Sequence, residues 1–256
     1  MNDNNTNNNA EQKEELDAKS NMSFLKHIEE LRKRIIISIV GVAVGCGCVG
    51  FFISDLMNNI FLKPALDVGM ELQNLVPFGQ PFLYFKVILA SGLILSMPFV
   101  LYQLWLFISP ALYKNEKKWI SKLTFFTSLC FIVGVLFSYF ILVPSMLNFA
   151  ASFGTDTIEN KIDINAYFGF ISLILLATGA VFELPILSFV LTKMGIVNSK
   201  MLSKYRKHSV IVILILAAVL TPTPDPVSQL IFAAPIFLLY ELSIIIARIV
   251  EKKEDK

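Results

Sequence analysis

The sequence predicts an all-α, polytopic membrane protein with six transmembrane helices. Hydrophobic residues make up 55% of the chain and charged residues only 16%, and the mean hydropathy is +0.65. This composition is typical of a membrane protein and argues against a globular enzyme. The net charge of +2 is too small to indicate a nucleic-acid partner. The lipid bilayer is therefore the first partner that the sequence predicts.

Six apolar runs can each span or nearly span a bilayer. They are Ile35 to Ser54, Phe82 to Ile108, Leu123 to Phe149, Ile164 to Thr192, Ser209 to Thr221 and Leu230 to Ala247. The fifth run is short for a hydrocarbon core about 30 Å thick, and the sixth is at the low end of the usual range. We expect a locally thinner bilayer or flanking helices to accommodate these two runs.

The two ends of the chain predict tails outside the membrane. Residues 1–10 are mostly Asn and are followed by Glu and Lys, a composition that cannot bury a core. We predict a disordered tail at 1–22, a membrane domain at 23–250 and a second short tail at 251–256. The first tail is not a signal peptide, because no early basic region is followed directly by an apolar run.

The basic residues predict the orientation of the spans. They gather before the first run, after the second, after the fourth and at the C-terminus. The members of these clusters are Lys13, Lys19, Lys26, Arg32, Lys33 and Arg34, then Lys114, Lys117, Lys118 and Lys122, then Lys193, Lys200, Lys204, Arg206 and Lys207, and finally Arg248, Lys252, Lys253 and Lys256. The alternate loops carry only Lys63 and Lys161. The positive-inside rule then places both termini and both tails in the cytoplasm, which an even number of spans permits.

The segment before the first run contains a candidate site. Residues 24–34 place apolar side chains on one side of a helix, which predicts an amphipathic lead-in at the membrane surface. Glu30 lies in this lead-in, and Glu116 lies between the second and third runs. Both acids can simply pair with neighbouring Lys and Arg side chains, which is the simpler interpretation of the local pattern.

The loop after the first run predicts a structured cap on the other side of the membrane. Residues 55–80 contain Pro64 and Pro77 among scattered apolar residues, and Pro81 follows directly. Further along, Pro98 and Pro144 lie in or at the end of spans, where a kinked helix is the ordinary explanation.

Glu183 is the lone acidic residue in the otherwise uncharged fourth run. A carboxylate at this depth costs about 2.5 to 3.5 kcal/mol, so it normally faces a bundle interior or a wet cavity. Pro185 removes a backbone hydrogen bond and can kink the helix, leaving the carbonyl of Val181 in need of a partner. Two interpretations remain. Glu183 is protonated and joins helices as a hydrogen-bonding group, or it meets a polar group of a partner helix or admits water.

The hairpin between the fifth and sixth runs carries Asp225 and Gln229. Asp225 can cap the sixth helix, or both side chains can bind a partner. Metal and catalytic chemistry have no visible site, because the cysteines and the two histidines form no ligand-type or triad-type pattern. We therefore expect no metal, no cofactor and no enzymatic activity.

Several segments in order resemble the TatC family of twin-arginine translocases. The matching segments are His27-x-x-Glu30-Leu31-Arg32-x-Arg34, then Pro98-x-x-x-Tyr102-Gln103-x-Trp105-x-Phe107-x-x-Pro110-Ala111-Leu112-Tyr113-x-x-Glu116, then Phe182-Glu183-x-Pro185, Tyr205-Arg206 and Thr221-Pro222-Thr223-Pro224-Asp225-Pro226-Val227-Ser228-Gln229. The resemblance extends over nearly all of the chain from Phe24 to Ala247.

The resemblance implies a cup-like, six-helix receptor in the cytoplasmic (inner) membrane. Such a receptor binds twin-arginine signal peptides of folded precursor proteins and works with TatA and TatB-type subunits, with copies of itself and with the proton-motive force. Carried over by position, the signal-peptide residues are Glu30, Glu116, His27 and Arg32. The intramembrane and partner-binding residues are Glu183, Asp225 and Gln229, and the structural ones are Pro64, Pro98, Pro185 and Arg206.

The alternative function is that of a proton-coupled secondary transporter, in which Glu183 titrates and Asp225 acts as a gate. The chain shows no evident inverted repeat and no second intramembrane acid for a proton relay. A purely structural scaffold is a third possibility, and binding of an arginine-dependent peptide separates the receptor from both.

Overall fold

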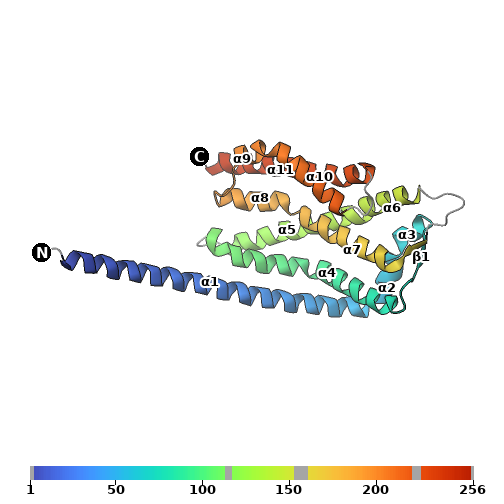
Figure 1. Ribbon diagram of the computed structural model, residues 1–256, viewed down its shortest axis with the longest axis horizontal. Helices are drawn as coiled ribbons and strands as arrows, with labels where there is room; N and C mark the ends of the chain where they lie inside the picture. Colours follow the sequence, from blue (N-terminus) through green and yellow to red (C-terminus); the bar gives the residue numbers. More distant parts are fainter. Residues whose placement is uncertain (1–2, 113–116, 153–160, 221–225, 255–256) are drawn as a thin grey trace.

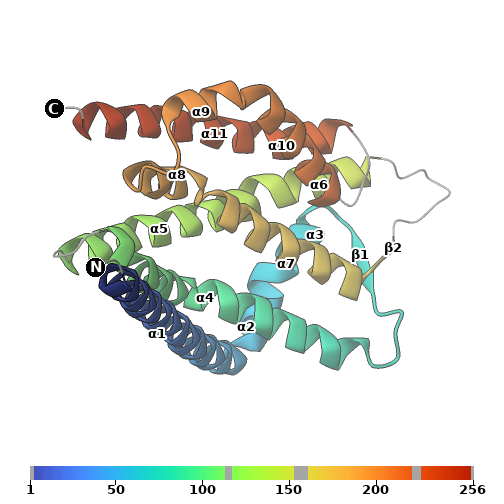
Figure 2. The same cartoon turned by 60° about the vertical axis from the view of Figure 1, so that its left-hand side comes forward.

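The computed structural model describes residues 3–112, 117–152, 161–220 and 226–254 (Figure 1). In space the helices follow one another from α1 at one edge, through α4, α5 and α7, to α10 and α11 at the other (Figures 1 and 2). Both marked ends of the chain lie at the same end of this wall of helices, and two short strands lie at the opposite end. The predicted helical membrane protein is confirmed, with a small sheet added.

The first helix, α1 (Asp3–Phe51), is longer than the predicted span. Its first half projects alone beyond the other helices (Figure 1). The backbone is therefore helical over the segment 3–22, where the composition predicts disorder. Once a helix has been nucleated by its membrane segment, each further residue adds one hydrogen bond, so the helix extends without a packing partner. The division into a tail and a membrane domain stays a prediction.

The first span packs along the second, α4 (Gly79–Leu112), at positions where both helices carry small residues. A Cβ atom added to Gly92 would lie 2.8 Å from the backbone of Cys46, and one added to Gly45 would lie 2.9 Å from the carbonyl of Gly92. Ser96 donates a hydrogen bond to the carbonyl of Gly41 at 3.2 Å. Small residues thus bring the two backbones together, as is common in membranes.

The predicted cap after the first span is confirmed as a structured region. It consists of α2 (Ile53–Leu56), a π-helix η1 (Met57–Phe61), α3 (Lys63–Asp67) and the strand β1 (Glu71–Gln73). β1 pairs in parallel with β2 (Lys161–Asp163), with Leu72 opposite Ile162. The cap lies at the end of the wall opposite both marked ends of the chain (Figure 1).

Pro64 shapes the hydrogen bonding of this cap. Proline has no N–H, so the carbonyl of Ile60 lacks its helical donor, and the hydroxyl of Tyr139 donates to it at 2.9 Å. One residue on, the hydroxyl of Tyr167 accepts from the amide of Ala65 at 3.2 Å and donates to the carbonyl of Phe61 at 2.8 Å. Two tyrosines from distant helices thus satisfy backbone groups that the irregular helix leaves unpaired.

The third span contains a π-helical segment, and the fourth span contains a break. The third is formed by α5 (Lys117–Phe137), a π-helix η2 (Ser138–Leu142) and α6 (Val143–Ala151). The fourth is formed by α7 (Ile164–Val181) and α8 (Leu184–Lys193), with Pro185 in the first turn of α8. The predicted kink at Pro185 therefore separates two helices at Phe182 and Glu183.

The last three helices form the far edge of the wall. They are α9 (Ser199–Lys204), α10 (Arg206–Leu220) and α11 (Pro226–Glu254). Among the described residues, five helical segments are long and apolar enough to cross a membrane, namely His27–Phe51, Gly79–Ile108, Ser121–Ala151, Ile164–Lys193 and Pro226–Lys252. The fifth predicted span corresponds to α10, whose 15 residues extend for only about 22 Å. Length and composition therefore support five of the six predicted spans.

The main core lies where the cap meets the middle of the wall. Phe168, Ile171 and Ile174 of α7 are fully buried, and they pack in one cluster with Phe61 of the cap and Phe232 of α11. The ring of Phe61 lies 5.5 Å from that of Phe168. This core fixes the cap against the membrane helices.

Candidate functional site

In the predicted lead-in, polar side chains begin a hydrogen-bonded network that joins α1 to α4. Arg34 donates to the side chain of Gln103 at 3.1 Å and, more weakly, to Glu30 at 3.4 Å. The contact with Glu30 joins residues four apart on one helix, and the Glu30 side chain remains 36% exposed. Arg34 is the more enclosed partner at 25% exposed, and its Nε has no hydrogen-bond partner among the described residues. Glu30 thus already holds a guanidinium group and retains free acceptor positions.

The other predicted residues of this site are arranged as follows. His27 stacks on Phe107 of α4 with the ring centroids 4.5 Å apart, which holds the lead-in against the second span. Arg32 is exposed on α1. Glu116 lies outside the described residues.

A cavity of about 480 Å³ opens beside Arg34 and Gln103, between α1 and α4. Apart from those two side chains and one serine, its lining is apolar. The lining residues are Leu31, Arg34, Ile35, Ser38, Ile39, Val42, Leu93, Val100, Gln103, Leu104 and Phe107. An acid that can accept arginine therefore lies next to a hollow that can accept an apolar side chain or segment. The spacing of Leu31, Ile35 and Ile39 along one helix face could have predicted this wall, but not its hollow shape.

Glu183 occupies the break between α7 and α8. Its Oε1 is buried without a hydrogen-bond partner among the described residues. The adjoining Phe182 packs on Phe137 with ring centroids 5.6 Å apart, so the break is held against α5. The break therefore holds a buried carboxyl oxygen with unused hydrogen-bonding capacity, and its role as a polar notch within the membrane stays a prediction.

The hairpin between α10 and α11 is only partly described. Gln229 donates to the carbonyl of Leu214 at 2.9 Å, which ties α11 to α10. Asp225 lies outside the described residues. Gln229 thus already has a structural hydrogen bond, which leaves its carbonyl oxygen available to a partner.

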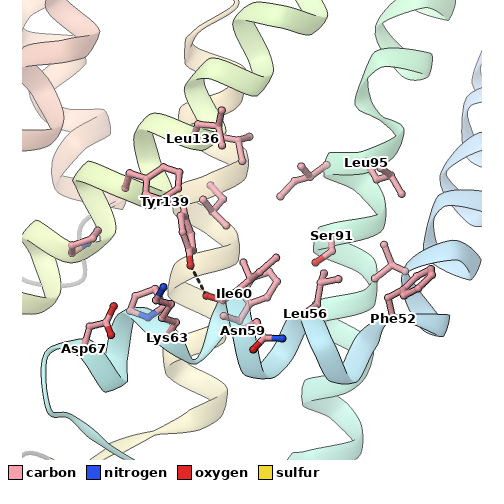
Figure 3. A pocket seen from close by; sticks show the side chains of 18 of the residues that line it. Phe52, Leu56, Asn59, Ile60, Lys63, Asp67, Ser91, Leu95, Leu136 and Tyr139 are labelled. Atoms are coloured by element: carbon pink, nitrogen blue, oxygen red, sulfur yellow. Dashed lines mark hydrogen bonds between the residues drawn. The ribbon is translucent and has the colours of Figure 1, made fainter.

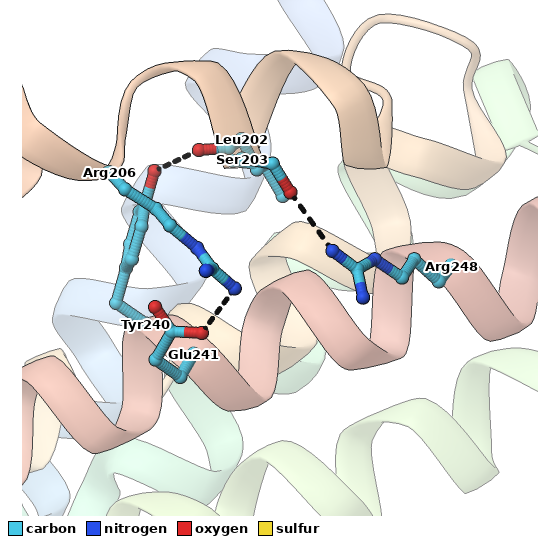
Figure 4. Close-up of polar contacts among 6 residues, drawn as sticks. All are labelled: Leu202, Ser203, Arg206, Tyr240, Glu241 and Arg248. Carbon is cyan, nitrogen blue, oxygen red and sulfur yellow. Dashed lines mark hydrogen bonds and ion pairs between the residues drawn. The ribbon is translucent and has the colours of Figure 1, made fainter.

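Arg206 belongs to a set of polar contacts between the α9–α10 corner and α11 (Figure 4). It pairs with Glu241 at 2.6 Å, while Tyr240 donates to the carbonyl of Leu202 at 2.9 Å and Arg248 donates to Ser203 at 3.3 Å. Beyond these contacts, Glu251 accepts hydrogen bonds from the amide and the hydroxyl of Ser199 at the start of α9. The structural role predicted for Arg206 has a definite partner, and Glu251 is a contact that sequence reasoning missed.

No group of three or more His, Cys, Asp or Glu side chains that could hold a metal occurs within the described ranges. The three cysteines, all described, are free, and Cys48 is exposed on α1. The site is thus built from charged, amide and apolar side chains.

Comparisons with known proteins agree with one another. The sequence profile described as Sec-independent protein translocase protein (TatC) matches residues 26–235. The protein of that name from Helicobacter pylori strain J99 is 39% identical over 225 residues, which is 88% of each chain. The one from Koribacter versatilis is 40% identical over 246 residues, which is 94% of this chain and 90% of the relative. A crystal structure of the twin-arginine translocase receptor TatC superposes with a TM-score of 0.79 at 34% identity, covering 88% of this chain and 99% of the other.

Proposed function

The chain belongs to the TatC family of Sec-independent protein translocases, and from this premise we propose that it is the signal-peptide receptor of a twin-arginine translocase. Proteins of this family are non-enzymatic components of a membrane translocase. The ligand is the twin-arginine signal peptide of a folded precursor protein. The observation that carries the proposal is Glu30, a half-exposed acid whose only described contact is a weak one with Arg34.

In this proposal Glu30 and Glu116 receive the two arginines of the signal peptide. A carboxylate accepts a forked, bidentate hydrogen bond from guanidinium that an ammonium group cannot reproduce. Gln103 holds Arg34 at 3.1 Å, so Arg34 can remain bound to α4 while an incoming arginine takes its place at Glu30. His27 stacks on Phe107 and keeps the lead-in in position, and Arg32 lies exposed on the same helix.

The cavity beside Arg34 supplies the affinity that the arginines lack. Two charge-assisted contacts of about 1.5 to 3 kcal/mol each give about 3 to 6 kcal/mol, which is near millimolar affinity before any ordering cost. Apolar residues of the signal peptide that enter the cavity of about 480 Å³ add about 0.8 kcal/mol for each buried CH₂ group. The acids then provide specificity, and the apolar wall provides much of the affinity.

We further propose that the end of the wall that carries the termini faces the cytoplasm of a cell with an inner membrane. The charge clusters of the loops support this orientation. The predicted count of six spans requires α10 to cross as the fifth, in a bilayer that adapts to its short length. A cysteine introduced at Gln73 in β1 should react with a membrane-impermeant thiol reagent from outside the cell, and one at Lys252 only after the membrane is permeabilised. The background should be a variant without Cys46, Cys48 and Cys130.

TatA and TatB-type subunits are the partners we propose for the intramembrane groups. The unpaired Oε1 of Glu183 can take a polar group of a partner helix, and Gln229 together with Asp225 can take one at the outer hairpin. Transport driven by the proton-motive force then requires these subunits, and the isolated protein should pass no folded cargo.

The test is binding of a twin-arginine signal peptide to the purified protein in nanodiscs. The peptide and its variant with both arginines changed to lysine are titrated against the wild type and a Glu30→Ala/Glu116→Ala variant. Loss of both charge-assisted contacts, about 3 kcal/mol or more together, should weaken binding about a hundredfold or more. Glu29→Ala is the matched control, because it removes an exposed acid from the same turn and should change binding little.

The double-mutant cycle decides whether the arginines meet these acids. Binding should weaken with the peptide change or the protein change, and combining the two should add little. Equal binding in all four combinations would leave only nonspecific apolar capture and overturn the proposed site. Losses that simply add would place the arginines elsewhere on the protein.

A further inference from the structure

A second, larger cavity of about 950 Å³ lies at the opposite end of the molecule from the proposed receptor site. It opens between the cap and the helices α1, α4 and α5 with η2, and Figure 3 shows its lining side chains from close by. Its volume is within the range of small-molecule sites. The proposed recognition of a signal peptide makes no use of it.

The walls of this cavity are apolar, and several of their side chains are exposed on the surface of the helices. Leu95 of α4 is 58% exposed, Leu136 of α5 is 48% exposed and Phe140 of η2 is 67% exposed. Phe52 at the end of α1 completes the wall and is also exposed. Side chains of this kind, at membrane depth, form a surface suited to hydrocarbon chains.

The floor of the cavity carries both signs of charge. Lys63 and Asp67 lie four residues apart in α3, and Asn59 of η1 lines the cavity one turn before Lys63 (Figure 3). Both charged side chains are exposed, and within the part of the chain that the structure describes neither has an ion-pair partner. The cap therefore presents an unpaired cation and an unpaired anion on the floor of an apolar cavity.

A further polar residue lies in the wall of the same cavity (Figure 3). Ser91 of α4 is only 8% exposed, and its hydroxyl has no hydrogen-bond partner among the described residues. Since Ser91 lines the cavity, a turn of its side chain about χ1 brings the hydroxyl to an acceptor bound there. A ligand that satisfies all of these groups carries an anion, a cation, a hydrogen-bond acceptor and long apolar chains.

We propose that this cavity binds one phospholipid whose headgroup carries a phosphate and a primary ammonium, as in phosphatidylethanolamine. The phosphate pairs with Lys63 and the ammonium with Asp67, Ser91 donates to an ester carbonyl, and an acyl chain lies along Leu95 and Leu136. A choline headgroup has no N–H to donate to Asp67, and a glycerol headgroup has no cation. The cavity should therefore select this headgroup among lipids that have identical chains.

The charges on the floor favour a lipid over a transmembrane helix of a partner protein. An apolar helix seated in the cavity would cover Lys63 and Asp67 without pairing either of them, and an unpaired charge removed from water is costly. A zwitterionic headgroup pairs both charges at once. Lipid binding in this cavity does not depend on the receptor function, because the two sites lie at different ends of the molecule.

The experiment is native mass spectrometry of the delipidated full-length protein titrated with phosphatidylethanolamine, phosphatidylcholine or phosphatidylglycerol with the same acyl chains. The wild type should bind phosphatidylethanolamine about two- to fivefold more tightly than the other two, the range expected for one partly exposed ion pair. Asp67→Asn should abolish this preference, and Lys63→Gln should weaken binding of all three lipids. Ser91→Ala should weaken all three without changing their order.

Lys86→Gln and Glu71→Gln serve as matched controls, because both residues are exposed and neither lines the cavity. Each should keep the wild-type preference. Equal binding of the three lipids to the wild type, or a preference that survives Asp67→Asn, would overturn the proposal. A competition with a synthetic apolar helix gives a further test. If the helix displaces the lipid and binds the wild type and the Lys63 and Asp67 variants equally, the cavity belongs to a protein partner and the proposal is overturned.

Discussion

Tyr167→Phe should destabilise the protein strongly, although it removes only a single hydroxyl group. The hydroxyl is buried, with the residue only 2% exposed, and it joins two backbone groups of the cap. It donates to the carbonyl of Phe61 at 2.8 Å and accepts from the amide of Ala65 at 3.2 Å. Removing it leaves a buried donor and a buried acceptor without partners.

The magnitude follows from these two groups. Each buried backbone group left unpaired costs about 1 to 3 kcal/mol, so both together cost about 2 to 6 kcal/mol. The amide of Ala65 can move toward the carbonyl of Phe61 and restore a regular helical bond, which would recover part of this loss. Pro64 and the core contact of Phe61 with Phe168 restrict that movement. We therefore expect a loss of about 2 to 4 kcal/mol in the free energy of unfolding.

The assay is reversible unfolding in mixed micelles, followed by circular dichroism. Tyr84→Phe is the control, because Tyr84 is 40% exposed and its hydroxyl has no hydrogen bond among the described residues. Tyr139→Phe should give an intermediate loss, since it orphans only the carbonyl of Ile60. A Tyr167→Phe variant as stable as Tyr84→Phe would refute the reasoning that the hydroxyl replaces a helical hydrogen bond.

Two further substitutions test the packing of the wall. Gly134→Ala should lower stability by about 1 to 3 kcal/mol, because the new Cβ would lie 2.8 Å from the ring of Phe182. In Gly47→Ala the new Cβ has no atom within 4 Å, so this variant should keep the wild-type stability or raise it in the same unfolding assay. Glu251→Gln should cost about 1 kcal/mol by weakening the hydrogen bonds that Ser199 donates at the first turn of α9, and greater proteolysis at the α9–α10 corner would report it. If cleavage there stays at the wild-type rate, these hydrogen bonds are not what holds the corner.

Much of the fold follows from hydropathy alone. The four long spans, the apolar run of α11 and the break beside Pro185 are all visible as patterns in the chain. The sequence also shows that the run forming α10 is short for a membrane span. Because of this short length, the count of six spans stays a prediction. Glu183 could be predicted as a polar group at depth because a single charge in an apolar run has a known cost.

The contacts that complete the structure could not be predicted, because they join residues far apart in sequence. The missing N–H of Pro64 predicts an orphaned carbonyl, but nothing local indicates that Tyr139, 79 residues after Ile60, supplies the donor. Likewise Arg34 finds Gln103 at a separation of 69 residues. The pairing of β1 with β2 depends on how the spans pack, and three-residue strands leave no reliable pattern.

The spatial order of the helices has a consequence for biogenesis. α1 packs on α4, α4 on α5, α5 on α7 and α10 on α11, so most spans meet a packing partner as soon as the next long span has been synthesised. Contacts between segments that are close in sequence form quickly. The ribosome synthesises these neighbouring helices one after the other, so each pair can pack before later helices are made. Among the contacts that must wait for later segments are those of α4 with α7, those of α11 with α8, and the two-stranded sheet of the cap. Truncated nascent chains that end after α5 should therefore already have α1 and α4 paired, while the far edge is completed only when α11 has emerged.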